Sequence, residues 1–162
     1  MNQELINRWN QTVTPDDTVY YLGDFSLSLV TVESITPQLQ GRKHLIMGNH
    51  DLCHPVNKKR ATPAREVYLR AGFESIEIES RIEIAGQSVL LHHFPYLTPA
   101  APDKYSNKFD KFRPKNEGQW LLCGHIHEKW RAQERMINVG VDVWNFSPVA
   151  MPKIKEMIMK SL

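Results

Sequence analysis

The stretch Gly48-Asn49-His50-Asp51 decides how the rest of the chain is interpreted. It follows the apolar run Leu45-Ile46-Met47, which has the composition of a short buried strand. A glycine at the end of a strand lets the backbone turn sharply and approach a bound group closely. An amide, an imidazole and a carboxylate then follow in a row. These residues also suit an ordinary turn, so the remaining sequence must decide whether they hold a metal ion or a reacting group.

Length and composition are those of a globular protein with one core. The chain has 162 residues, and we expect a single domain over residues 1–162. Its net charge of +2 gives no support to polyanion binding by bulk charge. The apolar runs are too short to cross a bilayer, and the N-terminus lacks the basic start and apolar core of a signal peptide. Two cysteines make no disulfide framework, so we expect a cytoplasmic protein without membrane association.

Hydrophobic periodicity predicts helices alternating with strands. Helices are expected over residues 2–11, 31–39, 63–71 and 152–160, the second weakened by Pro37. Strands are expected over residues 18–22, 43–47, 73–84, 88–91, 120–123 and 136–139. The long stretch from residue 73 allows two strands with a bend near Ser80, and Gly86-Gln87 is expected to turn a hairpin.

Residues 96–119 form a long predicted loop with several prolines and basic residues. Loops of this length in a compact domain are usually functional or disordered. The basic residues between Lys104 and Lys115 could flank the path by which an anionic substrate reaches a site, or they could form an ordinary solvated surface.

Four predicted strands end in residues that can bind a metal. These are Asp24, Asn49, His92 or His93, and His125 with His127. In sheets with helical crossovers, binding sites gather outside the strand ends, so neighbouring strands would bring such side chains together. Oxygen and imidazole ligands suit Mn, Fe, Co, Ni or Zn rather than calcium, and the chain has no thiolate cluster of the structural-zinc kind.

The ordered motifs resemble those of calcineurin-like metallophosphoesterases. They are Gly23-Asp24, Gly48-Asn49-His50-Asp51, a strand-end histidine followed by Phe94-Pro95, and Gly124-His125-Ile126-His127. The closing segment from Asn138 to Trp144 is similar to that of small bacterial and phage members, and the resemblance covers nearly the whole chain. It implies an α/β fold, a four-layer αββα sandwich of two mixed β-sheets with helices outside.

The resemblance also implies a set of ligands for two divalent metals, drawn from Mn, Fe, Ni, Co or Zn. The implied ligands are Asp24 as the bridge, Asn49, His93 and His125 around one ion, and His127 at the other. We prefer His93 to His92 because the family's histidine directly precedes the aromatic–proline pair. Asp142 is a candidate for orienting a ligand histidine.

The implied reaction is hydrolysis of a phosphodiester or phosphomonoester. Two metals would clamp the phosphate and lower the pKa of a bridging water, and the resulting hydroxide would attack phosphorus. His50 would stabilise the phosphate and protonate the leaving oxygen, while Asp51 would hold the His50 ring. The expected partner is a phosphorylated small molecule or a nucleotide. A nucleic-acid substrate has no motif to support it, because the chain lacks helix-turn-helix, zinc-finger and RNA-binding signatures.

One departure from the family pattern concerns the start of the domain. Family members open with a strand that ends in Asp-x-His and supplies two ligands to one metal, and no such motif precedes Asp24. Absence of this usually central strand would expose sheet edges. We consider three explanations and favour the first. The sequence starts at an internal methionine of a longer protein, or it is a truncated homologue that binds a partner with one metal or none, or a second chain covers the gap.

Overall fold

The computed structural model describes residues 2–97 and 109–161, so Lys104 and Lys108 of the predicted basic loop lie outside the described residues. The first half contains α1 (Asn2–Thr12), β1 (Thr18–Tyr21), α2 (Leu29–Ile35), β2 (Arg42–Ile46), α3 (Ala61–Ala71) and β3 (Phe73–Glu77). The second half contains β4 (Glu79–Ile84), β5 (Gln87–His92), β6 (Trp120–Cys123), β7 (Ala132–Gln133), β8 (Met136–Asn138) and α5 (Met151–Lys160). Short 3-10 turns lie at η1 (Thr36–Gln38), η2 (Pro55–Arg60), η3 (Asp110–Phe112) and η4 (Val141–Val143).

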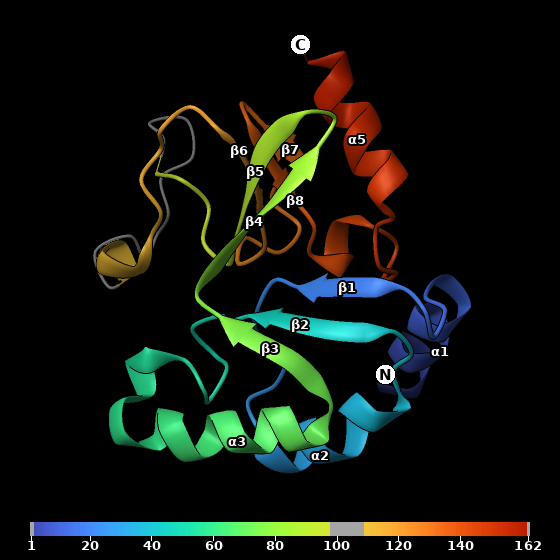
Figure 1. Ribbon diagram of the computed structural model, residues 1–162, viewed down its shortest axis with the longest axis vertical. Helices are drawn as coiled ribbons and strands as arrows, with labels where there is room; N and C mark the ends of the chain where they lie inside the picture. The colour runs from blue at the N-terminus through green and yellow to red at the C-terminus, as the bar shows by residue number, and fades with distance from the viewer. Residues whose placement is uncertain (1, 98–108, 162) are drawn as a thin grey trace.

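The strands form two sheets (Figure 1). The first sheet is parallel and has the order β1-β2-β3. The second has the order β4-β5-β6-β8-β7, with parallel pairs in its centre and antiparallel pairs at both edges. The chain passes from one sheet to the other at Ile78, two residues before the bend expected near Ser80. The α/β sandwich predicted from the sequence is confirmed, although its first sheet is wholly parallel rather than mixed.

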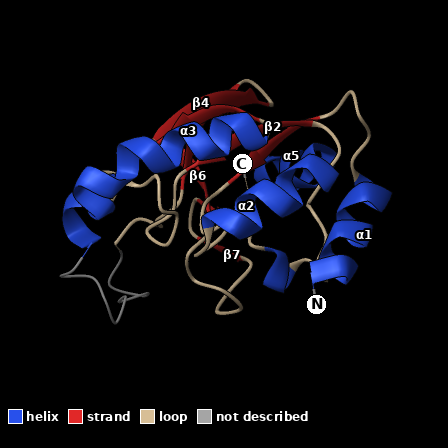
Figure 2. Ribbon diagram, turned by 90° about the horizontal axis from the view of Figure 1, so that it is seen from below, coloured by secondary structure: helices blue, strands red, loops and turns tan. Residues whose placement is uncertain are grey.

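Helices α1, α2 and α3 cover the outer face of the first sheet (Figures 1 and 2). The amphipathic pattern of each helix explains this, because its apolar side faces the sheet. Buried residues of these helices are Ile6 and Trp9 on α1, with Val13 directly after it, Val32 on α2, and Ala64, Tyr68 and Ala71 on α3. No helix within residues 2–97 and 109–161 is both long and apolar enough to cross a bilayer.

The core between the sheets is shared with the C-terminal helix. Its residues include Leu22, directly after β1, and Ile46, at the end of β2. Leu91 and Leu122 come from the second sheet, and Ile154 and Ile158 come from α5. Helix α5 therefore packs into this shared core and does not form a separate outer layer. A further cluster of β5, β6 and β8 residues packs with Tyr96 and Trp130.

Strand β1 is an edge strand, because among the described residues it pairs only with β2. A groove of about 540 Å³ runs along this edge. It is lined by the whole of β1, by part of α1 and by residues 148–152, and it reaches Asp24 and His127. The exposed sheet edge that the sequence analysis expected is therefore present.

Candidate metal centre

The loops that follow β1, β2, β5 and β6 meet where these parallel strands end, which is where α/β sheets place their sites. They carry Asp24, Asn49, His93 and His125. Ligand atoms of Asp24, His93 and His125 all lie within 4.8 Å of one another. The amide oxygen of Asn49 lies 3.2 Å from Nε2 of His93. The structure thus brings together four residues that the sequence analysis proposed as ligands of one ion.

The hydrogen bonding of His93 shows which ring atom faces this cluster. Its Nδ1 lies 2.8 Å from the carbonyl oxygen of Leu22, which can only accept, so Nδ1 carries the proton. In the neutral ring Nε2 then presents a lone pair, 3.4 Å from Oδ2 of Asp24 and 3.2 Å from Oδ1 of Asn49. Acceptors that face one another in this way repel unless a proton or a cation lies between them. A histidine whose other nitrogen is bound to a backbone carbonyl is also the usual form of a metal ligand. The donor set therefore fits a divalent transition metal.

Asp24 is fixed in an unusual backbone conformation. Its φ is +58°, in the left-handed region that few residues other than glycine adopt. Its Oδ1 accepts a hydrogen bond from the backbone amide of His50 at 2.9 Å. Burial raises the pKa of Asp24, but the hydrogen bond and charge of His93 in its protonated form, together with the amide of His50, bring that pKa below the usual value. The carboxylate therefore stays ionised, as a metal ligand must.

Two glycines allow the loops after β1 and β2 to touch. A Cβ atom on Gly48 would lie 2.2 Å from Oδ1 of Asp24. A Cβ atom on Gly23, whose φ is +88°, would lie 2.4 Å from Nδ1 of His93. Both distances are far inside van der Waals contact, so a side chain at either position would displace a proposed ligand. This is the close approach that the sequence predicted for a glycine at a strand end.

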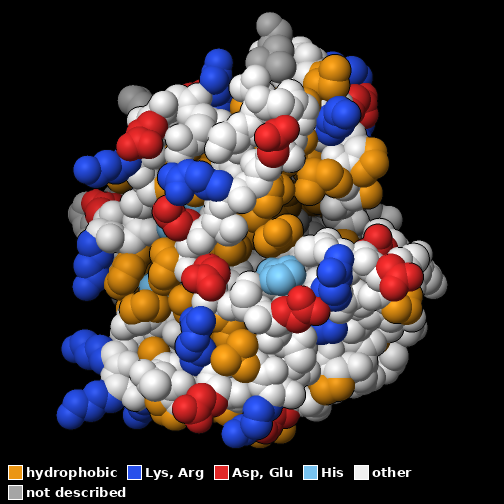
Figure 3. Space-filling view, viewed as in Figure 1, with side chains coloured by type: hydrophobic (Ala, Val, Ile, Leu, Met, Phe, Trp, Pro, Cys, Tyr) orange, Lys and Arg blue, Asp and Glu red, His pale blue; other side chains and the backbone are white. Residues whose placement is uncertain are grey.

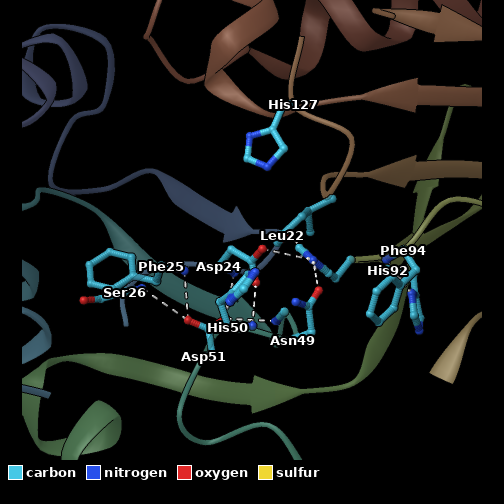
Figure 4. Close-up of polar contacts among 12 residues, drawn as sticks. Leu22, Asp24, Phe25, Ser26, Asn49, His50, Asp51, His92, Phe94 and His127 are labelled. Atoms are coloured by element: carbon cyan, nitrogen blue, oxygen red, sulfur yellow. Dashed lines mark hydrogen bonds and ion pairs between the residues drawn. The ribbon is translucent and has the colours of Figure 1, made fainter. Parts of the chain in front are cut away.

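The carboxylate of Asp51 holds these two loops together from the buried side. It is 0% exposed. Its Oδ2 accepts from the backbone amides of Asp24 and Gly48 at 2.8 and 2.9 Å, and its Oδ1 accepts from the amide of Phe25 at 2.8 Å. The sequence analysis expected Asp51 to hold the ring of His50. Among the hydrogen bonds of the described residues, its oxygens instead hold the backbone that carries Asp24 (Figure 4). Burial raises the pKa of Asp51, although the amide of Gly48 opposes that rise.

Tyr68, on α3, is a contributor that the sequence analysis missed. Its side chain is fully buried and its hydroxyl donates to Oδ1 of Asp51 at 3.1 Å. Burial and the charge of Asp51 raise the pKa of Tyr68 well above its usual value, so the hydroxyl remains a donor. A tyrosine on the buried side of a helix needs a polar partner, which is the one available sequence signal. The identity of that partner depends on how α3 packs.

His127 lies apart from the cluster (Figure 4). Its side chain is 74% exposed, and its Nδ1 is 3.5 Å from Oδ2 of Asp142. Asp142 is therefore in the position that the sequence analysis suggested, beside a histidine proposed as a ligand. The described residues place no third carboxylate or histidine with His127 in a metal-binding group.

The two remaining histidines of the motifs have different environments. His92 is buried, and its Nδ1 accepts from the backbone amide of Phe94 at 3.0 Å. Burial, aided by the charge of His93, lowers the pKa of His92 to about 4. His92 is thus a neutral packing residue outside the cluster, whereas His50 is exposed beside Asp24 (Figure 4).

Comparison with known proteins identifies the family to which the chain belongs. Residues 1–148 match the model of the calcineurin-like phosphoesterase superfamily domain. The Gene 66 protein of Mycobacterium phage D29 is 31% identical in an alignment of length 165, and the match spans 95% of this chain and 81% of that protein. An uncharacterized protein of Methanocaldococcus jannaschii is 28% identical over 170 residues, which cover 99% of this chain and 76% of that protein.

Two solved structures share the fold. A protein of unknown function from Aquifex aeolicus has a TM-score of 0.69 and 26% identity, covering 96% of this chain and 84% of its own. A novel archaeal phosphodiesterase has a TM-score of 0.51 and 20% identity over 86% of this chain and 74% of its own, which concerns the fold alone. Since the family model spans residues 1–148, the chain belongs to the calcineurin-like phosphoesterase superfamily.

Proposed function

We propose that this protein hydrolyses a phosphate ester with the help of a divalent metal ion held by Asp24, Asn49, His93 and His125. Its family is one of phosphoesterases, which supports hydrolysis of a phosphoester bond in general. The observation that carries the proposal is that Nε2 of His93 lies 3.2 Å from Oδ1 of Asn49 and 3.4 Å from Oδ2 of Asp24, so that three acceptor atoms are gathered at one point.

Each residue of the centre has a distinct part in this proposal. Mn, Fe, Co, Ni or Zn would suit the oxygen and imidazole donors, and the ion supplies Lewis acidity and activates water when bound. Asp24 brings a negative charge, and Asn49 brings a neutral oxygen that leaves the centre positive toward a phosphate. His50 is exposed beside Asp24, where its ring could donate a proton to the leaving oxygen.

A second candidate function is binding without hydrolysis. The separation of His127 from the other proposed ligands favours it, because the described residues then offer a full donor set for one ion only. Such a protein would hold a single metal and a phosphate-bearing partner. Metal content and turnover distinguish the two candidates.

The test is hydrolysis of an aryl phosphodiester and an aryl phosphomonoester, with Mn²⁺ and with a chelator. An Asn49→Ala, His125→Ala double variant is compared with an Asn7→Ala, His44→Ala control, which removes the same two residue types away from the centre. Manganese-dependent turnover in the wild type and the control, lost by about 100-fold or more in the double variant, would support the proposal. Equal turnover by all three would refute the ligand assignment. Binding of one Mn²⁺ without turnover would favour the second candidate.

A further inference from the structure

Two short turns, η2, which is basic, and η3, lie together beside the proposed metal centre. The ring of His54, which precedes η2, is 4.8 Å from the ring of Phe112 in η3. Asn57 in η2 donates from Nδ2 to the carbonyl oxygen of Asp51 at 3.0 Å. The first turn is thereby attached to the residue that holds the Asp24 loop.

The second turn is attached to the histidine side of the same centre. Arg113, directly after η3, donates to the carbonyl oxygen of Pro95 at 3.1 Å, and its guanidinium lies 5.2 Å from the ring of Phe94. The Phe94 ring in turn contacts the rings of His93 and His125, with centroids 5.0 and 4.7 Å apart. Turn η2 is therefore linked to Asp24 through Asp51, and Arg113, the residue after η3, is linked to His93 and His125 through Phe94.

Positive charge accumulates on η2, whereas in η3 Asp110 is adjacent to Lys111 and lies 3.7 Å from Arg113. Lys58, Lys59 and Arg60 of η2 and Lys111 of η3 are exposed, and none of them forms an ion pair with another described residue. Residues 52–65 contain four Lys or Arg and no Asp or Glu, in a chain whose net charge is only +2. Figure 3 shows Lys and Arg side chains along the left margin, where η2 and η3 lie in Figure 1.

Several exposed cations on the helices and on the second sheet have a carboxylate partner instead. Examples are the pairs Arg8–Glu4, Arg70–Glu33, Arg81–Glu79 and Lys160–Glu156. A surface that keeps several cations free of carboxylates next to a phosphoesterase centre has a high affinity for further negative charge. A small phosphate ester fills only the centre itself and leaves these cations without a ligand.

We infer that the substrate is a nucleic-acid strand whose backbone continues from the metal centre across η2 and η3, an inference that rests on the proposed function. Phosphates at regular intervals are the anions that would meet both the centre and the adjacent cations. Lysine-rich contacts of this kind hold the phosphate backbone without reading bases, so recognition would be independent of sequence. An anionic membrane fits less well, because no large exposed apolar side chain of the described residues belongs to either turn.

The test measures binding of a fluorescent twelve-nucleotide single-stranded DNA by anisotropy, in a chelator so that no turnover occurs. The variant Lys58→Gln, Lys59→Gln, Arg60→Gln is compared with Lys153→Gln, Lys155→Gln, Lys160→Gln, which removes the same charge from α5. The first variant should raise the Kd at least about 10-fold at low salt and reduce the slope of log K against log salt by about two, since each phosphate contact on a single strand contributes about 0.7. The control should change the Kd less than about 2-fold.

The inference is overturned if the η2 variant and the α5 control bind the DNA equally, or if vesicles of anionic phospholipid compete the DNA away. Manganese-dependent cleavage of the same DNA by the wild type, reduced in the η2 variant, would support it. Hydrolysis of the small aryl diester decides the proposed function separately. Turnover of that diester without charge-dependent DNA binding refutes the inference alone, whereas DNA binding without any turnover refutes the proposed reaction.

Discussion

The two sides of the proposed metal centre differ in how firmly hydrogen bonds and burial hold their side chains. On one side, which we call the oxygen side, Asp24, Asn49 and Asp51 come from the loops of the first sheet, and buried Asp51 binds backbone amides of both loops. On the other side, the open side, His127 and Asp142 face each other at 3.5 Å with a 74% exposed histidine. The groove along β1 also borders the open side.

This difference indicates that the backbone fixes the proposed ligands of one ion, whereas it does not fix the exposed residues on the other side. The oxygen side has a hydrogen-bond partner for each buried carboxylate oxygen, so its geometry is determined by the backbone. The open side depends on two exposed side chains, which lose conformational freedom when they order around a ligand. Affinity for a first ion should therefore come almost wholly from the oxygen side and the two histidines, His93 and His125, that face it.

The largest expected effect comes from breaking the oxygen side with Asp51→Ala. The change leaves the backbone amides of Asp24, Phe25 and Gly48 without an acceptor in a buried site, at about 1–3 kcal/mol for each group. We expect the free energy of unfolding in urea to fall by about 3–5 kcal/mol and Mn²⁺ binding to be lost by calorimetry. The matched change Asp142→Ala, on the open side, should alter stability by less than about 0.5 kcal/mol. Equal losses in the two variants would contradict the comparison.

A smaller effect is expected for the pH dependence of stability, through His54, which directly precedes η2. Burial lowers the pKa of His54 from 6.5 to about 4, and its Nδ1 accepts from the amide of Val56 at 3.1 Å. Because the folded-state pKa is the lower one, this histidine contributes stability above pH 6.5 that is lost as the pH falls toward 4. Asn in its place keeps an acceptor and cannot be protonated.

Denaturation in a chelator at several pH values tests this prediction. Between pH 6.5 and 4 the wild type should lose about 2 kcal/mol more stability than His54→Asn. The same substitution at His127, whose side chain is 74% exposed on the open side, is the control for the change of residue type. A profile for His54→Asn that parallels the wild type would show that another group causes the acid loss.

The smallest effect is expected for His127→Ala. We expect the Kd for the first Mn²⁺ to change less than about 2-fold and stability by less than about 0.5 kcal/mol, because this exposed side chain is outside the ligand cluster. Calorimetric titration of both proteins measures it, with His93→Ala as the variant that should abolish binding. A tenfold weakening in His127→Ala would show that the open side closes on the same ion.

Hydrophobic periodicity was sufficient to place the strands whose ends carry the proposed ligands. It could not show that β3 and β4 belong to different sheets, because apolar and charged residues alternate through both and the separation at Ile78 arises from packing. The predicted hairpin is present, but its turn is Ala85-Gly86, one residue early. Ala85 adopts a φ of +54°, which alanine rarely does, so only Gly86 left a signal in the sequence.

In the candidate site too, contacts that depend on packing could not be predicted from the sequence. The motif suggested that Asp51 serves its neighbour His50, because adjacent residues are all that a short motif can relate. Its partners in the structure include the amides of Asp24 and Phe25, which lie 27 and 26 residues away. Such contacts depend on how two parallel strands are placed, and a backbone amide leaves no trace in residue type. Tyr68 was missed for the same reason.

The positive φ angles of three motif residues have a consequence for protein engineering. Asp24, His125 and His127 have φ values of +58°, +69° and +50°, where glycine would be relaxed. Replacing any of them with glycine would ease the main chain while deleting a donor atom. Directed evolution for heat resistance, screened without a metal-dependent readout, would therefore tend to replace these three proposed ligands before it altered core residues.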